Sequence, residues 1–250
     1  MKAKLGVNVV AAVLCGVVMY TGVQHWQDQT EAQAQASEGK PYTVHREKQF
    51  SDVSAYTKNL PEFITEQIES SIANKKPLTL VLATSANESG WPEQLKKELE
   101  KTYGSDVFSV KTLSYGNQTT DELVSSHIAV QIDKLQPNII LFETPLQNDY
   151  QQLTLDETLQ NTDELIHQLK DLKKTLIIQP SQPYLSQAES YEEGVEAIRG
   201  VSEENWVHYI NHSLIWPFHL GEYVHKSDGH LTKKGGEVWG SYLVNWFTGK

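Results

Sequence analysis

Two segments far apart in the chain carry side chains that together could perform nucleophilic catalysis. Ser85 follows the apolar run 78–82, and His230 lies near the C-terminus directly after an Asp-Gly pair. A serine hydroxyl is a weak nucleophile until a neighbouring imidazole takes its proton, so Ser85 needs a histidine that the fold brings to it. His230 is the candidate base, and Asp228 is the candidate carboxylate that orients its ring.

This chemistry also needs hydrogen-bond donors for the negative charge of a tetrahedral intermediate. Gly116 and Asn148 each follow an apolar run, and open parallel sheets bind ligands beyond the carboxyl ends of their strands. The main-chain N–H groups of Ser85 and Gly116 and the amide of Asn148 could supply three such donors. Taken singly, these residues have ordinary explanations, because serine caps helices and asparagine and glycine form turns.

The elements that position these residues are predicted from alternating apolar runs and amphipathic helices. The runs are short enough for strands, and between them apolar residues recur every four positions, which is typical of helices. Capping boxes at Thr119-x-x-Glu122 and Thr154-x-x-Glu157 indicate two helix starts. The predicted strands are 78–82, 107–113, 138–143 and 175–179, and the predicted helices are 92–103, 120–135, 154–173, 187–198, 203–210 and 235–247. This alternation predicts an α/β domain with a parallel sheet covered on both faces.

The first 23 residues predict a membrane helix. Lys2 and Lys4 precede the uncharged run 5–23, which as a helix would be about 28 Å long, close to the hydrocarbon thickness of a bilayer. Lysines before the run place the N-terminus inside and the remainder outside. We expect a single-pass anchor at 1–23 with an extracellular domain. The alternative is a signal peptide cleaved at an Ala-x-Ala sequence between 32 and 36, which gives a secreted protein.

The remainder of the chain divides into three predicted parts. Residues 24–59 are a polar linker, and 60–76 form an amphipathic helix that packs on the domain. Residues 77–250 form the domain itself and are numerous enough for one core. Cys15 lies in the apolar run and is the only cysteine, so the exported part is predicted to contain no disulfide.

Charge and histidine spacing bear on the possible partners. The formal net charge is −11, and no cluster of Lys and Arg provides the positive stripe that a nucleic-acid backbone needs. His208 and His212 are four residues apart, but Tyr209 occupies the position where a zinc protease carries its glutamate. We therefore expect no nucleic acid, no metal and no cofactor.

Taken in order, the polar segments resemble the SGNH (GDSL-like) hydrolase family, which is named after a Ser, a Gly, an Asn and a His in four successive blocks. The resemblance covers 77–250 and rests on Ser85 with Gly90-Trp91-Pro92, on 115–123 and on 143–149. It implies a three-layer α/β/α sandwich with a flavodoxin-like sheet. The catalytic positions that it implies are Ser85, Gly116, Asn148 and His230, with either Asp228 or a main-chain carbonyl oxygen as the group that orients the His230 ring.

The resemblance also implies a function and shows two departures. It implies a serine esterase that acts on O-acylated envelope or extracellular polysaccharide, or on lipid esters. However, Ala83-Thr84 stand where the family has Gly-Asp, and Ser227 stands three residues before His230, where the family has its acid. These departures motivate the alternative of an inactive SGNH-like domain that binds glycan or protein at the cell surface. Acyl transfer to a sugar by the same residues is a third possibility.

Overall fold

The structure is a computed structural model that describes residues 53–250 except 86–89, 151, 186–187, 218 and 228. The chain divides into the units Met1–Gln49 and Phe50–Lys250, and the description below concerns the second. The predicted membrane helix at 1–23 and most of the predicted linker lie outside the described residues. Within these residues, no helix has both the length and the apolar character that crossing a membrane requires.

Five parallel strands form one sheet in the order β2-β1-β3-β4-β5. The strands are β1 (Leu78–Thr84), β2 (Phe108–Ser114), β3 (Ile139–Thr144), β4 (Thr175–Pro180) and β5 (His208–Tyr209). β1 and β3 are buried along nearly their whole length, as expected for central parallel strands covered on both faces. The order is flavodoxin-like: β2 lies on one side of β1, and β3, β4 and β5 follow on the other side. The topological switch point of the sheet therefore lies between β1 and β3. The predicted parallel sheet is confirmed.

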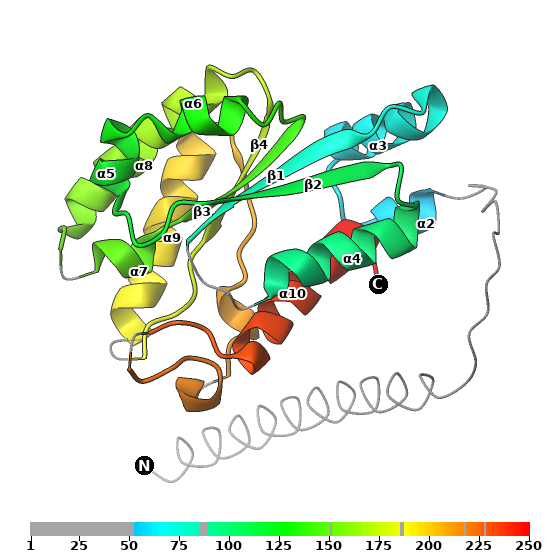
Figure 1. Ribbon diagram of the computed structural model, residues 1–250. Coiled ribbons are helices and arrows are strands. Elements are labelled where there is room, and N and C mark those ends of the chain that lie inside the picture. The colour runs from blue at the N-terminus through cyan, green and yellow to red at the C-terminus, as the bar shows by residue number, and fades with distance from the viewer. Residues whose placement is uncertain (1–52, 86–89, 151, 186–187, 218, 228) are drawn as a thin grey trace, which may run out of the picture. The chain divides into compact units, whose positions relative to one another are not determined.

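Helices cover both faces of this sheet (Figure 1). One layer contains α3 (Glu62–Asn74), α4 (Trp91–Tyr103) and α10 (Lys233–Thr248); the other contains α5 (Thr120–Ser125), α6 (Ile128–Asp133), α8 (Leu155–Lys170) and α9 (Ala188–Glu204). The short helices are α2 (Ser54–Thr57), α7 (Leu146–Asp149), η1 (Ser213–Ile215) and η2 (Leu220–Glu222). Two hydrophobic clusters, one on each face, make up the core.

Alternate residues of β1 enter the two clusters. Leu80 and Leu82 pack with α3, α4 and α10, whereas Val81 and Ala83 pack on the other face. On the first face the ring of Trp91 stacks on Trp239 of α10, with centroids 5.0 Å apart. The three-layer α/β/α arrangement follows because successive residues of the buried central strands point to opposite faces of the sheet and both faces are covered.

The helix starts agree with the predicted capping boxes. The main-chain N–H of Thr119 donates to Glu122 Oε2 at 3.1 Å, and that of Thr154 donates to Glu157 Oε2 at 2.8 Å. These bonds satisfy N–H groups that a helix leaves without a partner. The predicted apolar stripe of α3 is also present, because Ile64 is buried in the hydrophobic cluster on the first face of the sheet.

Three predicted elements differ from the structure. The helix predicted over 120–135 is two helices, α5 and α6, because His127 has a left-handed φ of 51°. The helix predicted over 203–210 is wrong: α9 ends at Glu204, Trp206 has a φ of 57°, and the two-residue strand β5 follows. In α10 the buried stripe includes Trp239, Leu243 and Phe247, each one residue after the predicted stripe of Val238, Tyr242 and Trp246.

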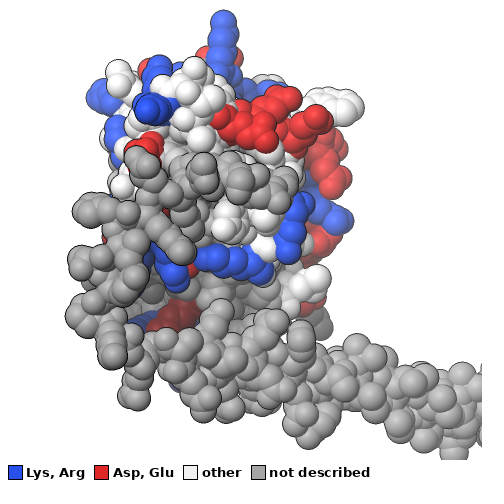
Figure 2. Space-filling view, turned by 90° about the vertical axis from the view of Figure 1, so that its right-hand side faces the viewer, with Lys and Arg blue, Asp and Glu red and all other residues white. Residues whose placement is uncertain are grey.

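Charged side chains of both signs lie close together on the face drawn in Figure 2. Among the described residues of that face, Asp and Glu gather mainly in one area at the upper right, and Lys and Arg lie around it.

Candidate active site

Ser85 lies at the carboxyl end of β1, at the switch point of the sheet. The register pairs Ala83 with Phe142 of β3 and with Leu113 of β2, so Ser85 has a neighbouring strand on each side. Its side chain is buried, and its main-chain N–H donates to Oε2 of Glu143 at 3.4 Å. The candidate nucleophile is thus placed where open α/β sheets bind their ligands.

Gly116 lies next to Ser85. The N–H of Tyr115 donates to the carbonyl oxygen of Thr84 at 3.0 Å, which extends the ladder between the two strands by one residue. Gly116 has a φ of 68°, a conformation that favours glycine, and a Cβ built on it would have no atom within 4 Å. Its N–H donates to Ser114 Oγ over a long distance of 3.4 Å. The backbone of Gly116 is therefore open to close approach.

Asn148 joins the loop after β3 to the loop after β2. Its Nδ2 donates to the carbonyl oxygens of Gln118 at 2.8 Å and of Gly116 at 3.3 Å. The structure therefore brings Asn148 beside Gly116. Both amide protons are directed to main-chain oxygens, so Asn148 holds the Gly116 loop in place.

Asp149 performs a structural role in the same turn. It is buried, and its carboxylate accepts from the Thr120 N–H and the Thr120 hydroxyl, each at 2.7 Å. Burial raises the pKa of Asp149, and the hydrogen bonds from Thr120 oppose that rise. Asp149 thereby caps α5 and fixes α7 against it.

The loop that carries His230 is attached to the residues after β3. The carbonyl oxygen of Gly229 accepts from Nε2 of Gln147 at 2.8 Å, and Gln147 is the neighbour of Asn148. The loop closes on itself, because the His225 N–H donates to the His230 carbonyl oxygen at 2.7 Å and Val224 forms an antiparallel bridge with Leu231. His230 is half-buried, and Asp228 lies outside the described residues.

Glu143, the last but one residue of β3, is a member of this site that is not among the residues predicted from the sequence. Its side chain is 0% exposed, and Oε2 accepts from the Thr84 hydroxyl and the Ser85 N–H. Oε1 has no hydrogen-bond partner among the described residues. Burial raises the pKa of Glu143 to about 7, against the lowering effect of the bonds from Thr84 and Ser85. Its sequence signal is a charged residue at the end of an apolar strand.

The histidines weighed as metal ligands have other surroundings. His212 is fully buried; its Nδ1 accepts from Trp216 Nε1 at 3.1 Å, so Nε2 carries the proton and donates to the Pro180 carbonyl oxygen at 2.8 Å. Burial lowers the pKa of His212 to about 4, which makes it a neutral structural residue. In the part of the chain that the structure describes, no group of three or more His, Cys, Asp or Glu residues is arranged to hold a metal ion.

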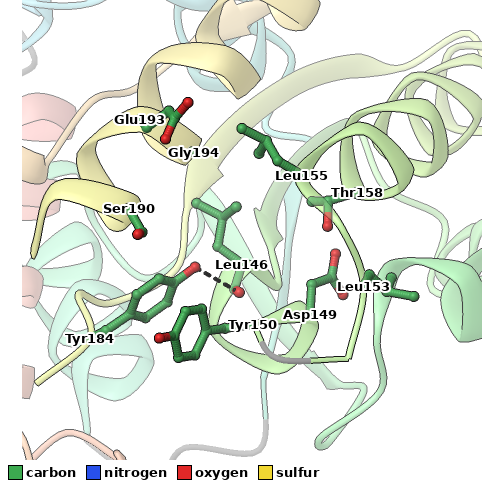
Figure 3. A pocket seen from close by; sticks show the side chains of 10 residues that line it. All are labelled: Leu146, Asp149, Tyr150, Leu153, Leu155, Thr158, Tyr184, Ser190, Glu193 and Gly194. Atoms are coloured by element: carbon green, nitrogen blue, oxygen red, sulfur yellow. Dashed lines mark hydrogen bonds between the residues drawn. The ribbon is translucent and has the colours of Figure 1, made fainter. Parts of the chain in front are cut away.

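A pocket of about 280 Å³ lies against α7 (Figure 3). Leu146 stands in its middle, between Ser190 and Glu193 of α9 and the start of α8. The Tyr184 hydroxyl donates to the Leu146 carbonyl oxygen at 2.8 Å, and Tyr150 stacks on Tyr184 with centroids 4.6 Å apart. α7 thus presents Leu146 to this pocket, whereas its middle residues hold the loops of Gly116 and His230.

No family model and no curated protein matches this sequence. Solved structures do match its fold. An alpha/beta hydrolase from the metagenome of Lake Arreo has a TM-score of 0.58 and 13% identity, with 69% of this chain and 95% of that chain covered. The acetyl xylan esterase AlAXEase has a TM-score of 0.55 and 10% identity over 66% and 98% of the two chains. A lipolytic protein of the G-D-S-L family from Desulfitobacterium hafniense has a TM-score of 0.54 and 15% identity over 67% and 98%. The described part of the chain therefore has the fold of the SGNH (GDSL) hydrolases.

Proposed function

We propose that this chain is an SGNH-type serine esterase with Ser85 as nucleophile and His230 as base. One observation carries the proposal: a continuous set of hydrogen bonds joins the four loops that bear the candidate residues. Tyr115 bonds to Thr84, Asn148 bonds to the loop of Gly116, and Gln147 bonds to Gly229 beside His230. These four loops carry the residues of one mechanism and meet beyond the carboxyl ends of the strands. This arrangement favours a common site.

In the mechanism, His230 takes the proton of the Ser85 hydroxyl while Oγ attacks the carbonyl carbon of the ester. The resulting oxyanion accepts from the N–H groups of Ser85 and Gly116 and from the Asn148 amide. The bonds that now occupy these donors are long, at 3.4, 3.4 and 3.3 Å, so they exchange readily for a stronger acceptor. His230 then gives the proton to the leaving alcohol and activates a water that hydrolyses the acyl-enzyme.

Asp228 is our candidate for the group that orients His230. It stands two residues before the histidine, one residue nearer than the family pattern places its acid. If Asp228 does not perform this role, a main-chain carbonyl oxygen is the alternative acceptor for the ring N–H.

For the substrate we favour O-acyl groups on envelope or extracellular polysaccharide over lipid esters. One structural neighbour is an acetyl xylan esterase, and another is a family 3 carbohydrate esterase from Clostridium thermocellum. The N-terminal apolar run and its preceding lysines support a membrane-anchored enzyme whose domain lies outside the cell, where such polymers occur.

A fluorophosphonate probe tests the proposed nucleophile. We expect the wild-type chain to be labelled and to hydrolyse p-nitrophenyl acetate, and Ser85→Ala to lose both by at least about 10³-fold. Ser241→Ala, which changes an exposed serine of α10, is the matched control and should behave like wild type. Labelling that persists in Ser85→Ala assigns the nucleophile elsewhere. A wild-type chain that neither labels nor hydrolyses supports the alternative, a binding domain, which the altered Gly-Asp positions favour.

The same preparation separates hydrolysis from acyl transfer. With an acetylated polysaccharide and an excess of acceptor sugar, a hydrolase releases free acetate in proportion to substrate consumed. Acetate that instead appears on the acceptor identifies a transferase, which uses the same residues.

A further inference from the structure

Glu143 is a buried ionisable group of this site that the mechanism above does not use. Its oxygen Oε2 accepts from the Thr84 hydroxyl and, at 3.4 Å, from the Ser85 N–H. Its other oxygen, Oε1, has no hydrogen-bond partner among the described residues. If Glu143 were ionised, one of its two carboxylate oxygens would have no hydrogen-bond donor among the described residues, in a place with no exposure to water. Burying such a charge is costly.

The groups that face Glu143 do not neutralise a negative charge. Tyr115, from the loop after β2, donates its hydroxyl to the main-chain oxygen of Glu143 at 2.7 Å. Burial raises the pKa values of Tyr115 and of Tyr191, which comes from α9, and the charge of Glu143 adds a smaller rise. Within the part of the chain that the structure describes, no Lys or Arg contributes to the pKa of Glu143. The surroundings therefore favour the protonated form.

Ionisation of Glu143 would act directly on the reacting groups. A carboxylate is a stronger acceptor than a neutral carboxyl group, so it would compete for the Ser85 N–H that the oxyanion needs. It would also place a negative charge beside the position where a second negative charge develops, in an interior that screens charge poorly. A neutral carboxyl group keeps its carbonyl oxygen as the acceptor for Thr84 and Ser85 without this repulsion.

We propose that Glu143 is a positioning residue that must be protonated for Ser85 to react. This inference rests on the proposed esterase function. The pKa of Glu143, which burial raises to about 7, makes the neutral form available near neutral pH.

The substitution Glu143→Gln tests this inference, because glutamine has the shape of the neutral carboxyl group and does not ionise. We would measure kcat/KM for p-nitrophenyl acetate between pH 5.5 and 8.5, with Ser85→Ala as the background. The quantity compared is the ratio of kcat/KM in Glu143→Gln to kcat/KM in wild type at each pH. We expect this ratio to rise by at least about tenfold across the range, because wild type loses its protonated form above pH 7.

A ratio that is flat, or that falls with rising pH, overturns the inference, provided that circular dichroism shows Glu143→Gln to be folded. Thr84→Val gives a second, independent readout. It removes a hydroxyl that stabilises the carboxylate, so the alkaline loss of activity should move to higher pH. An unchanged midpoint also contradicts the proposal. If wild type is active and both readouts are negative, only this inference fails; if wild-type activity is absent, the esterase function itself fails.

Discussion

At the scale of single residues, burial decides the roles of the ionisable side chains in this protein. Asp149 and Glu143 are both enclosed, but Asp149 has strong donors on both oxygens and serves as a cap, whereas Glu143 has donors on one oxygen only. His212 is neutral because its ring lies in the core between Trp216 and Pro180. The same residue types at the surface would be ordinary charged groups.

The pKa of Glu143 predicts how stability depends on pH. Its folded-state pKa is raised from 4.5 to about 7, so between these values the folded chain holds a proton that the unfolded chain has lost. The contribution to stability is complete below pH 4.5 and is lost as pH rises through 7. Relative to Glu143→Gln, wild type should lose about 3 kcal/mol of unfolding free energy between pH 4.5 and 8.

Urea unfolding of both proteins at pH 4.5, 6 and 8 measures this difference. Glu66→Gln, at an exposed position of α3, is the control for the chemical change itself and should show the same difference from wild type at each pH. Equal stability differences for Glu143→Gln at pH 4.5 and 8 would show that Glu143 does not titrate in this range.

At the scale of elements, the loops after the strands are held by side chains of their neighbours. α7 is four residues long, and its two middle residues bond to the loops of Gly116 and Gly229. Gly229 has a φ of 73°, and a side chain there would collide with Gln147 Nε2. The position of His230 therefore depends on a contact between Gly229 and Gln147, which are 82 residues apart in sequence.

Gln147→Ala tests this dependence. Loss of the 2.8 Å bond to Gly229 should loosen the His230 loop and lower kcat/KM by about tenfold, while unfolding free energy changes by only about 1 kcal/mol. Gln168→Ala on α8, which removes one side-chain hydrogen bond to Glu164, should leave kcat/KM at the wild-type value. Unchanged kinetics in Gln147→Ala would mean that other contacts position the loop.

Some boundaries of helices and strands cannot be predicted from local sequence patterns. The strands β1 to β4 and the caps at Thr119 and Thr154 lie where the sequence predicts them, because each depends on residues a few positions apart. β5 was missed because its two residues pair with β4 and have no period of their own. His127 and Trp206 interrupt helices in left-handed conformations that non-glycine residues rarely adopt, so local propensity does not indicate them.

At the scale of the whole molecule, the described residues form one α/β/α unit, and the sequence predicts that a membrane helix precedes it. We expect the full chain to stay with membranes after an alkaline carbonate wash, and a chain without residues 1–23 to be soluble and active. Protease added outside intact cells should degrade the domain. A mature chain that begins after the Ala-x-Ala sequences between 32 and 36 would identify a cleaved signal peptide instead.

The sequence alone determined the strands β1 to β4 and most of the helices between them, the four polar blocks and the identities of Ser85, Gly116, Asn148 and His230 as candidates. It could do so because periodicity, capping and turn chemistry act between residues that are close in the chain. These patterns also predicted the parallel sheet. A parallel sheet places the polar blocks that follow its strands together at the carboxyl ends of those strands.

Only the tertiary structure decided which groups are buried and what they contact. The enclosure of Glu143 beside Ser85, the neutral state of His212 and the bond from Gln147 to Gly229 each join residues that are tens of positions apart. Desolvation and hydrogen bonding across such separations depend on how the layers pack, and no pattern within one segment of the chain encodes them.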